Sequence, residues 1–407
     1  MSESSLARGA FRSAIWLLFG YEAWLNFVVP QESGYTTLHL VGYVALLLIL
    51  AILAVSGVRL LLSGAANAFP RSVRVTWALL VLWGIYSGLR VFDWGDFRDA
   101  AYAWVTPWAS GIWLVPIAAL WGAAASVRSD FERQLTLETI FASVLMGAGY
   151  FADFGRALNA NYSDLNVLGV SGLVLLFSEK KAPARLSLAV AAFTLFAVGQ
   201  FLLGLRNGML RVLFYVVALG VLLVPRFFQE RTGPLRVALL LGLTVGAAWT
   251  AQRQVTADER AVELAQQAFM KMVGGYNSRE ALIRELRSDL SAKEWLLGSD
   301  SGQYWSEELK AMRGNVEGGY LELSMRGGLL YVVLFAATVL PPMIRGLQWP
   351  VGSPLWLLGL YIFERLVWMV TYGNPVVDLG YVTFWIAVGA CASVQRDQRG
   401  AEGRALV

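Results

Sequence analysis

Two arginines stand beside a tight turn in a chain that is otherwise strongly apolar. Arg206 lies in the turn 205–208, between two apolar segments, and Arg211 follows about one helical turn later. A guanidinium group suits phosphate because its planar fork donates to two oxygens at once. Arginines near the end of a membrane span also extend toward lipid headgroups, so from the turn alone both interpretations stay open.

A second group of arginines follows Ser278, a residue type that commonly begins helices. Leu282, Ile283, Leu286 and Leu290 repeat at helical spacing, which predicts an amphipathic helix from Ser278 onward. Arg284 is spaced to pair with Glu280 and is interpreted as a surface residue. Arg279 lies in the first turn, close to a glycine-rich break, and is the candidate for binding an anion. Arg287 is a weaker candidate, and a solvated surface role is the alternative for both.

An acid stands at the start of a later apolar helix. Glu317 precedes Gly318 and Gly319, and glycines allow other groups to approach the backbone closely. A carboxylate is also favoured at any helix N-terminus, which is the simpler interpretation. Tyr320 and Arg326 follow in the same segment, and a charge near the start of a span usually faces protein or a wet cavity.

Other features exclude several kinds of chemistry. The chain has one cysteine, Cys391, and one histidine, His39, which excludes an internal disulfide and argues against histidine-based metal or catalytic sites. No phosphate-binding P-loop, paired-aspartate metal motif or serine-hydrolase elbow is present. Phosphate chemistry would therefore depend on arginines, with no metal and no cofactor. The mid-span pair Glu364-Arg365 is interpreted as structural pairing with other helices.

Composition indicates which elements position these residues. Hydrophobic residues make up 57% of the 407 and charged residues 15%, against roughly half and a quarter in soluble domains. The apolar residues form blocks near the roughly 20 residues that cross a bilayer, where only helices satisfy the backbone. The sequence predicts an all-α polytopic membrane protein with about 12 transmembrane helices, near residues 13–29, 38–62, 73–92, 101–126, 135–153, 165–178, 185–204, 207–225, 235–252, 320–344, 353–372 and 377–394.

Loop charges predict the sidedness of these spans. Basic residues gather in alternate loops, as Arg71 with Arg74 and Lys180 with Lys181 illustrate, while the other loops are neutral or acidic. Basic loops stay on the cytoplasmic side, so both termini are expected in the cytoplasm and the net charge of +4 does not indicate nucleic acid.

The same sidedness divides the chain into three regions. Residues 1–252 hold transmembrane helices 1–9, residues 253–319 form a small helical periplasmic loop domain, and residues 320–407 hold helices 10–12 and a cytoplasmic tail. A short helix is expected over residues 303–313 within that domain. The short sixth span at 165–178 decides the side of the domain, because its removal would reverse every later loop.

Taken in order, these motifs resemble the O-antigen ligase/polymerase superfamily, which contains Wzy-type polysaccharide polymerases and WaaL-type O-antigen ligases. The matching features are Arg206 in its turn, Ser278-Arg279, the segment 295–298, and the run 317–328 that ends in two glycines. Ligases carry a His-Asn pair where this chain has Glu317-Gly318, and Tyr331 replaces a family glycine. The resemblance covers about residues 185–345 by motif and favours a polymerase.

The resemblance implies a GT-C-like glycosyltransferase in the bacterial inner membrane, with its active site facing the periplasm. Its substrate would be an undecaprenyl-diphosphate-linked oligosaccharide, and a chain-length regulator would be a partner. Arg206 and Arg279 would stabilise the departing diphosphate, and Glu317 would act as general base, with inversion at the anomeric carbon. Arg211, Arg287, Arg326 and Tyr320 would contact diphosphate or glycan. The alternatives are an O-antigen ligase that uses lipid A-core or another acceptor, and a lipid-linked glycan flippase or transporter.

Overall fold

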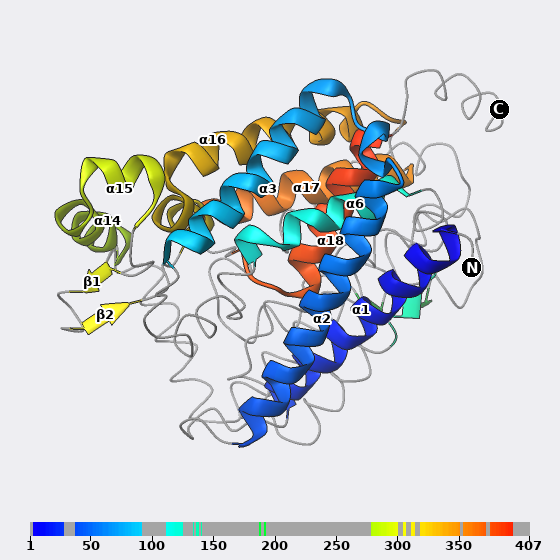
Figure 1. The fold of residues 1–407 in the computed structure, drawn as a ribbon, viewed down its shortest axis with the longest axis horizontal. Coiled ribbons are helices and arrows are strands. Elements are labelled where there is room, and N and C mark those ends of the chain that lie inside the picture. Colours follow the sequence, from blue (N-terminus) through cyan, green and yellow to red (C-terminus); the bar gives the residue numbers. More distant parts are fainter. Residues whose placement is uncertain are drawn as a thin grey trace. The chain divides into compact units, whose positions relative to one another are not determined.

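The computed structural model describes part of the chain, and its elements are shown in Figure 1. The described residues are 3–27, 37–91, 111–124, 133, 136–137, 140, 187–188, 191–192, 278–299, 304–306, 311–313, 318–350, 353–371 and 375–393. The chain divides into two compact units, one of residues 1–131 with 278–407 and one of residues 132–277. All elements discussed below belong to the first unit.

Long apolar helices dominate this unit. They are α1 (Glu3–Phe27), α2 (Thr37–Leu62), α3 (Arg71–Val91), α16 (Gly319–Leu347), α17 (Pro354–Thr371) and α18 (Leu379–Ser393). Except for the start of α1, which precedes the predicted residue 13, these bounds agree with the predicted spans to within a few residues. Within the described ranges, three helices are long and apolar enough to cross a membrane: α2, α3 and α16. The chain is therefore described as a membrane protein.

Several sequence predictions fall elsewhere. The spans predicted at 135–153 and 185–204 are described only at isolated helical positions, and those at 165–178, 207–225 and 235–252 lie outside the described residues. The number of spans, the sidedness and the three-region division thus stay predictions.

Of the span predicted at 101–126, residues 111–124 are described, and they do not form one continuous α-helix. The described stretch Gly111–Ala123 is apolar, but a 3₁₀ turn, η2 (Val115–Ala118), separates its first turn from α6 (Ala119–Ala123). Pro116 lies in that 3₁₀ turn and has no N–H to donate to an α-helical hydrogen bond. The indole N–H of Trp77 donates to the Pro116 carbonyl at 2.9 Å, which satisfies an acceptor at the break.

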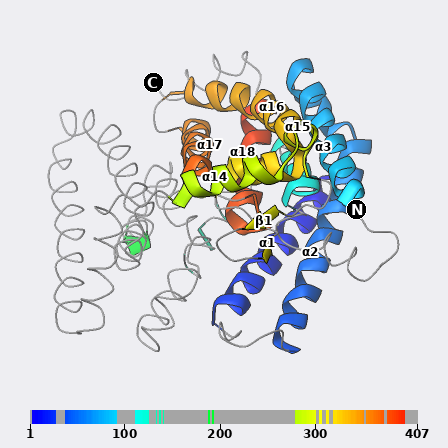
Figure 2. The ribbon, with the colours of Figure 1, turned by 90° about the vertical axis from the view of Figure 1, so that its left-hand side faces the viewer.

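Helix α18 lies at the centre of the packing. Every residue from Leu379 to Ala392 is buried, between α6, α16 and α17 (Figure 2). Two glycines allow α6 and α18 to meet backbone to backbone. A Cβ on Gly122 would lie 1.9 Å from the carbonyl oxygen of Ile386, and one on Gly389 would lie 1.8 Å from that of Ala119. Small residues at helix crossings permit this close approach in membrane proteins.

A similar contact joins the cytoplasmic-side ends, by the predicted sidedness, of α16 and α17. A Cβ on Gly359 would lie 2.8 Å from the carbonyl carbon of Gly346, and one on Gly346 would lie 2.9 Å from Sγ of Cys391. The thiol is buried here and lies 3.7 Å from the carbonyl oxygen of Leu355. The single cysteine, in α18, therefore lies against both α16 and α17.

The segment before α16 contains two short helices. Helix α14 (Ser278–Asp289) begins at the serine that the sequence indicated. Helix α15 (Ala292–Leu297) was not predicted, although Ser291 and Glu294 form a reciprocal capping box with the spacing that marks a helix start. Together, residues 278–299 are called the outer segment below, after the side of the membrane that the loop charges predict for them.

The short helix predicted over 303–313 is wrong. The described residues there form two antiparallel strands, β1 (Tyr304–Ser306) and β2 (Ala311–Arg313), with Trp305 opposite Met312. Backbone hydrogen bonds between the two strands replace those of the expected helix. The backbone N–H of Trp305 also donates to Asp289 Oδ2 at 2.8 Å, which fixes the ribbon to α14. The described residues between 278 and 313 thus form two short helices and a small β-ribbon.

Helix α16 is kinked near its start. Gly328 has φ 73° and ψ 175°, a conformation that interrupts the helical hydrogen bonds and that glycine alone adopts at low cost. A Cβ at this position would lie 2.2 Å from the carbonyl oxygen of Leu296 and 2.6 Å from the N atom of Gly298. The kink therefore brings the backbone of α16 against the end of α15.

Gly328→Ala is expected to destabilise the protein by about 3 kcal/mol or more, because backbone strain adds to a clash with the backbone of Leu296 and Gly298. Thermal unfolding of the purified protein in detergent measures the effect. Gly20→Ala in α1 is the control, since nothing lies within 4 Å of a Cβ there. Equal unfolding temperatures for the two variants would contradict the described kink.

Candidate functional site

The kink in α16 frees backbone carbonyls that the outer segment and α3 then satisfy. The backbone N–H of Ser299 donates to the Met325 carbonyl at 2.6 Å. The indole N–H of Trp83, in α3, donates to the Gly327 carbonyl at 2.7 Å. An unsatisfied carbonyl in apolar surroundings costs free energy, so these two donors stabilise the break.

Apolar contacts also hold the outer segment against α16. Leu286 of α14 and Leu290, which directly follows this helix, form a buried cluster with Met325 of α16. Trp295 of α15 and Leu321 of α16 pack against this cluster. The periodicity of leucines in the sequence thus marks the face that α14 turns toward α16. Arg287, one residue beyond Leu286, is exposed on another face.

An ion pair lies in the first turns of α16. Arg326 Nε donates to Glu322 Oε1, and the two residues are one helical turn apart. The Glu322 side chain is 0% exposed and the Arg326 side chain is 15% exposed. Spacing i, i+4 favours the pair, and the buried carboxylate fixes the orientation of the guanidinium group. The arrangement can present an oriented positive charge beside the outer segment.

The structure describes the predicted site residues unevenly. Arg326 lies in the pair with Glu322, and Tyr320, which is half-buried, donates its hydroxyl to the Leu366 carbonyl at 3.0 Å. Arg279 belongs to the first turn of α14, and only its backbone is described. Arg206, Arg211 and Glu317 lie outside the described residues. The catalytic roles of Arg206, Arg279 and Glu317 therefore stay predictions.

Glu322 had no assigned role in the sequence analysis. Its spacing to Arg326 was the available signal, because a glutamate four residues before an arginine is the common orientation of a helical ion pair. What the sequence did not contain is the burial of the carboxylate. Glu322 is buried in a helix against which α3, α15 and α17 all pack.

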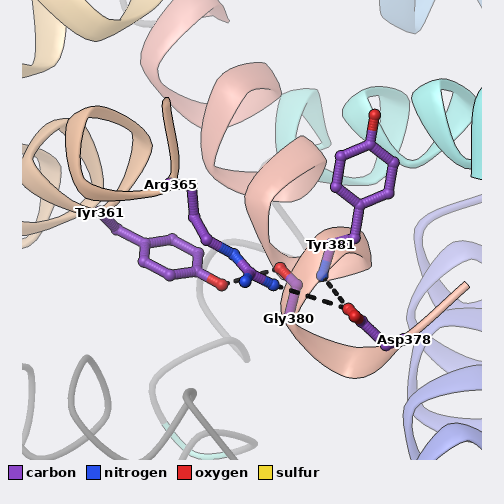
Figure 3. Close-up of polar contacts among 5 residues, drawn as sticks. All are labelled: Tyr361, Arg365, Asp378, Gly380 and Tyr381. Atoms are coloured by element: carbon purple, nitrogen blue, oxygen red, sulfur yellow. Dashed lines mark hydrogen bonds and ion pairs between the residues drawn. The ribbon is translucent and has the colours of Figure 1, made fainter. Parts of the chain in front are cut away.

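A second group of charges lies between α17 and α18 (Figure 3). The Arg365 guanidinium is 3.6 Å from Asp378 Oδ1, and both residues are buried together with Glu364. Asp378 also caps α18, because its Oδ1 accepts from the backbone N–H of Tyr381. The interpretation of Arg365 as structural pairing with another part of the bundle agrees with this ion pair.

Tyr361 and Gly380 complete this group. The Tyr361 hydroxyl donates to the Gly380 carbonyl at 2.7 Å, and the Arg365 guanidinium carbon lies 5.8 Å from the Tyr361 ring centre. A Cβ on Gly380 would lie 2.0 Å from an Arg365 nitrogen, so glycine leaves the space that the guanidinium fills. In the described part of the chain, no group of three or more His, Cys, Asp or Glu side chains could hold a metal ion.

Comparison of the chain with protein-family models, curated proteins and solved structures found no match.

Replacing Arg326 is expected to destabilise the protein more than replacing Glu322, its partner in α16. Arg326→Met leaves a fully buried carboxylate and should destabilise by about 3 kcal/mol, whereas Glu322→Gln leaves a partly exposed guanidinium and should cost about 1–2 kcal/mol. Thermal unfolding in detergent measures both, with exposed Arg287→Met as the control. A larger cost for Glu322→Gln would contradict the described burial.

Asp378 is expected to act both as a cap and as a counter-ion. Asp378→Asn keeps a capping oxygen and loses the charge, so Asp378→Ala should be less stable than Asp378→Asn by about 1 kcal/mol. Arg365→Met should cost less stability in Asp378→Asn than in the wild type, because the two side chains form an ion pair and their effects are coupled. Unfolding temperatures that are equal for the alanine and asparagine variants would show that the cap contributes nothing.

Proposed function

We propose that this membrane protein is a polymerase of O-antigen or exopolysaccharide repeat units. It transfers a glycan from undecaprenyl diphosphate to a sugar hydroxyl of another lipid-linked repeat, at the periplasmic face of the bacterial inner membrane. The resemblance in motif order supports the substrate class. The structural observation that carries the proposal is the Glu322–Arg326 pair, an oriented guanidinium next to the outer segment.

The proposed reaction is a displacement at the anomeric carbon. The acceptor hydroxyl oxygen forms a bond to that carbon, the bond from the carbon to the diphosphate oxygen breaks, and undecaprenyl diphosphate leaves with the electron pair. Glu317 takes the hydroxyl proton. Arg206 and Arg279 stabilise the charge that develops on the diphosphate, without a metal. One attack with one base predicts inversion at the anomeric centre.

Arg326 fits the lipid-diphosphate part of this proposal. It belongs to a helix that is long and apolar enough to cross a membrane, and it lies seven residues after the helix start at Gly319. Charges at such positions face protein or a wet cavity rather than lipid. The Glu322 carboxylate orients Arg326, so less conformational freedom is lost when a diphosphate oxygen binds. Tyr320 keeps its acceptor lone pairs for a glycan hydroxyl, since the contact to Leu366 uses its proton.

Glu317 favours a polymerase over a ligase. The resemblance places a His-Asn pair of the ligases at the positions of Glu317 and Gly318. The only histidine, His39, belongs to the first turn of α2, far from Glu317 in the sequence. A carboxylate at this position is the group available to accept the proton of an attacking hydroxyl.

Deletion of the gene is expected to leave single repeat units on their acceptor, as a gel of the surface glycan would display. Long chains that stay on the lipid carrier would instead indicate a ligase. Plasmid copies with Arg279→Ala or Glu317→Ala should fail to restore chain length, while Arg284→Ala, on the same helix as Arg279, should restore it. Normal chain length with both site variants would show that the proposed site is wrong.

Reconstitution separates the polymerase from a transporter. Purified protein in vesicles with lipid-linked repeat should lengthen the glycan, and EDTA should leave the rate unchanged because arginines carry the charge stabilisation. Movement of the lipid-linked repeat between leaflets without lengthening would indicate a flippase. Loss of activity in EDTA would contradict the metal-independent mechanism.

A further inference from the structure

Arg90 joins the outer end of α3, by the predicted sidedness, to the outer segment. Its Nη1 donates to the Leu297 carbonyl and its Nη2 to the Ser299 carbonyl, each at 2.9 Å. These carbonyls lie on either side of Gly298. Arg90 stands in the last turn of α3, and the Leu297 carbonyl belongs to the last residue of α15. The guanidinium therefore satisfies an acceptor that a helix end leaves without an internal partner.

The loop that Arg90 holds is in backbone contact with the kink of α16. Gly298 has φ +95°, and a Cβ there would lie 2.3 Å from the Arg326 carbonyl oxygen and 2.8 Å from Arg90 Nη2. On the other side, a Cβ on Gly328 would lie 2.2 Å from the Leu296 carbonyl oxygen. The backbones at Gly298 and Gly328 thus meet with no side chain between them. Arg90, from α3, contacts the same place.

Helix α3 holds both sides of this contact. Arg90 donates to the outer segment, while Trp83 donates to the Gly327 carbonyl of α16. These two residues are seven positions apart and lie on the same face of α3, two turns from each other. One face of α3 therefore holds the outer segment and the kink of α16 in fixed positions relative to each other. The contact also fixes Arg326, whose own carbonyl lies against Gly298.

We propose that Arg90 is a positioning residue that keeps the outer segment, and with it the helix that carries Arg279 and Arg287, against the start of α16. This inference rests on the proposed function, because those arginines are the ones that would bind the lipid diphosphate. Arginine is required here for its geometry. A planar fork reaches two carbonyl oxygens at once, whereas a lysine ammonium is a single point charge on a flexible stem.

The test compares Arg90→Gln and Arg90→Lys with the wild type, all as full-length protein in lipid nanodiscs. Arg74→Gln is the matched control, because Arg74 lies on the same helix and its guanidinium donates to Asn67 Oδ1 at 2.6 Å, away from the outer segment. Two quantities are measured. One is amide hydrogen exchange over residues 292–299, and the other is KM and kcat for lengthening of a purified lipid-linked repeat.

In Arg90→Gln, exchange at the Ser299 amide should become roughly ten-fold faster and KM should rise roughly ten-fold, since misplaced binding groups weaken substrate positioning. Arg90→Lys should lie between the wild type and Arg90→Gln, and Arg74→Gln should match the wild type. A purely structural role would instead lower kcat in proportion to the folded fraction, leave KM unchanged and make the lysine variant no better than the glutamine variant.

Three outcomes overturn the inference. Unchanged exchange in Arg90→Gln would mean that Arg90 does not hold the segment. Faster exchange with unchanged KM would mean that the held segment does not position the substrate. A wild type that lengthens nothing would remove the proposed function and the positioning role with it, while the exchange measurement would still decide whether Arg90 holds the outer segment.

Discussion

A break in an apolar helix leaves backbone carbonyls that the lipid interior cannot satisfy, and this constraint organises the described part of the molecule. Gly328 breaks α16 near its start, and the carbonyls of Met325 and Gly327 then accept from Ser299 and Trp83. The donors come from segments more than 200 positions apart in the chain. The kink, the outer segment and α3 therefore depend on one another, because none of them satisfies its polar groups alone.

Buried charged side chains in the described part of this protein also lie beside a partner of opposite charge, as two pairs illustrate. Glu322 is fully buried and lies beside Arg326, and Arg365 lies beside Asp378, which in turn caps α18. Buried ion pairs contribute little net stability, but the loss of one partner is costly. The Arg365–Asp378 pair joins α17 to the start of α18 and therefore restricts how these two helices can be arranged. The pair in α16 lies next to the outer segment, because the Arg326 carbonyl lies against Gly298.

The sequence was informative about helices and less informative about what joins them. Hydropathy predicted the bounds of α2 and α17 closely, since the bilayer dictates both length and composition. The ribbon at 304–313 was missed because strands of three residues are too short for periodicity to distinguish them from a helix turn.

Site prediction met a different limit. Arg326 was found because a charge in a span is unusual, and Ser278 because serine commonly begins helices. Arg90 is not among the site residues predicted from the sequence, because its partners are the backbone carbonyls of Leu297 and Ser299, and a backbone acceptor leaves no mark in the residue types. Contacts made by backbone atoms are thus the part of this site that spacing alone could not predict.

The burial of Cys391 has a practical consequence. The chain has no other cysteine, and this thiol is buried beside Gly346 and the Leu355 carbonyl at the start of α17. A water-soluble maleimide should find no accessible thiol in the folded protein, so a single cysteine introduced on the outer segment would be the one that reacts. Spin labels or fluorophores can then report on α14 in the otherwise native sequence, without first replacing a residue at the centre of the helix packing.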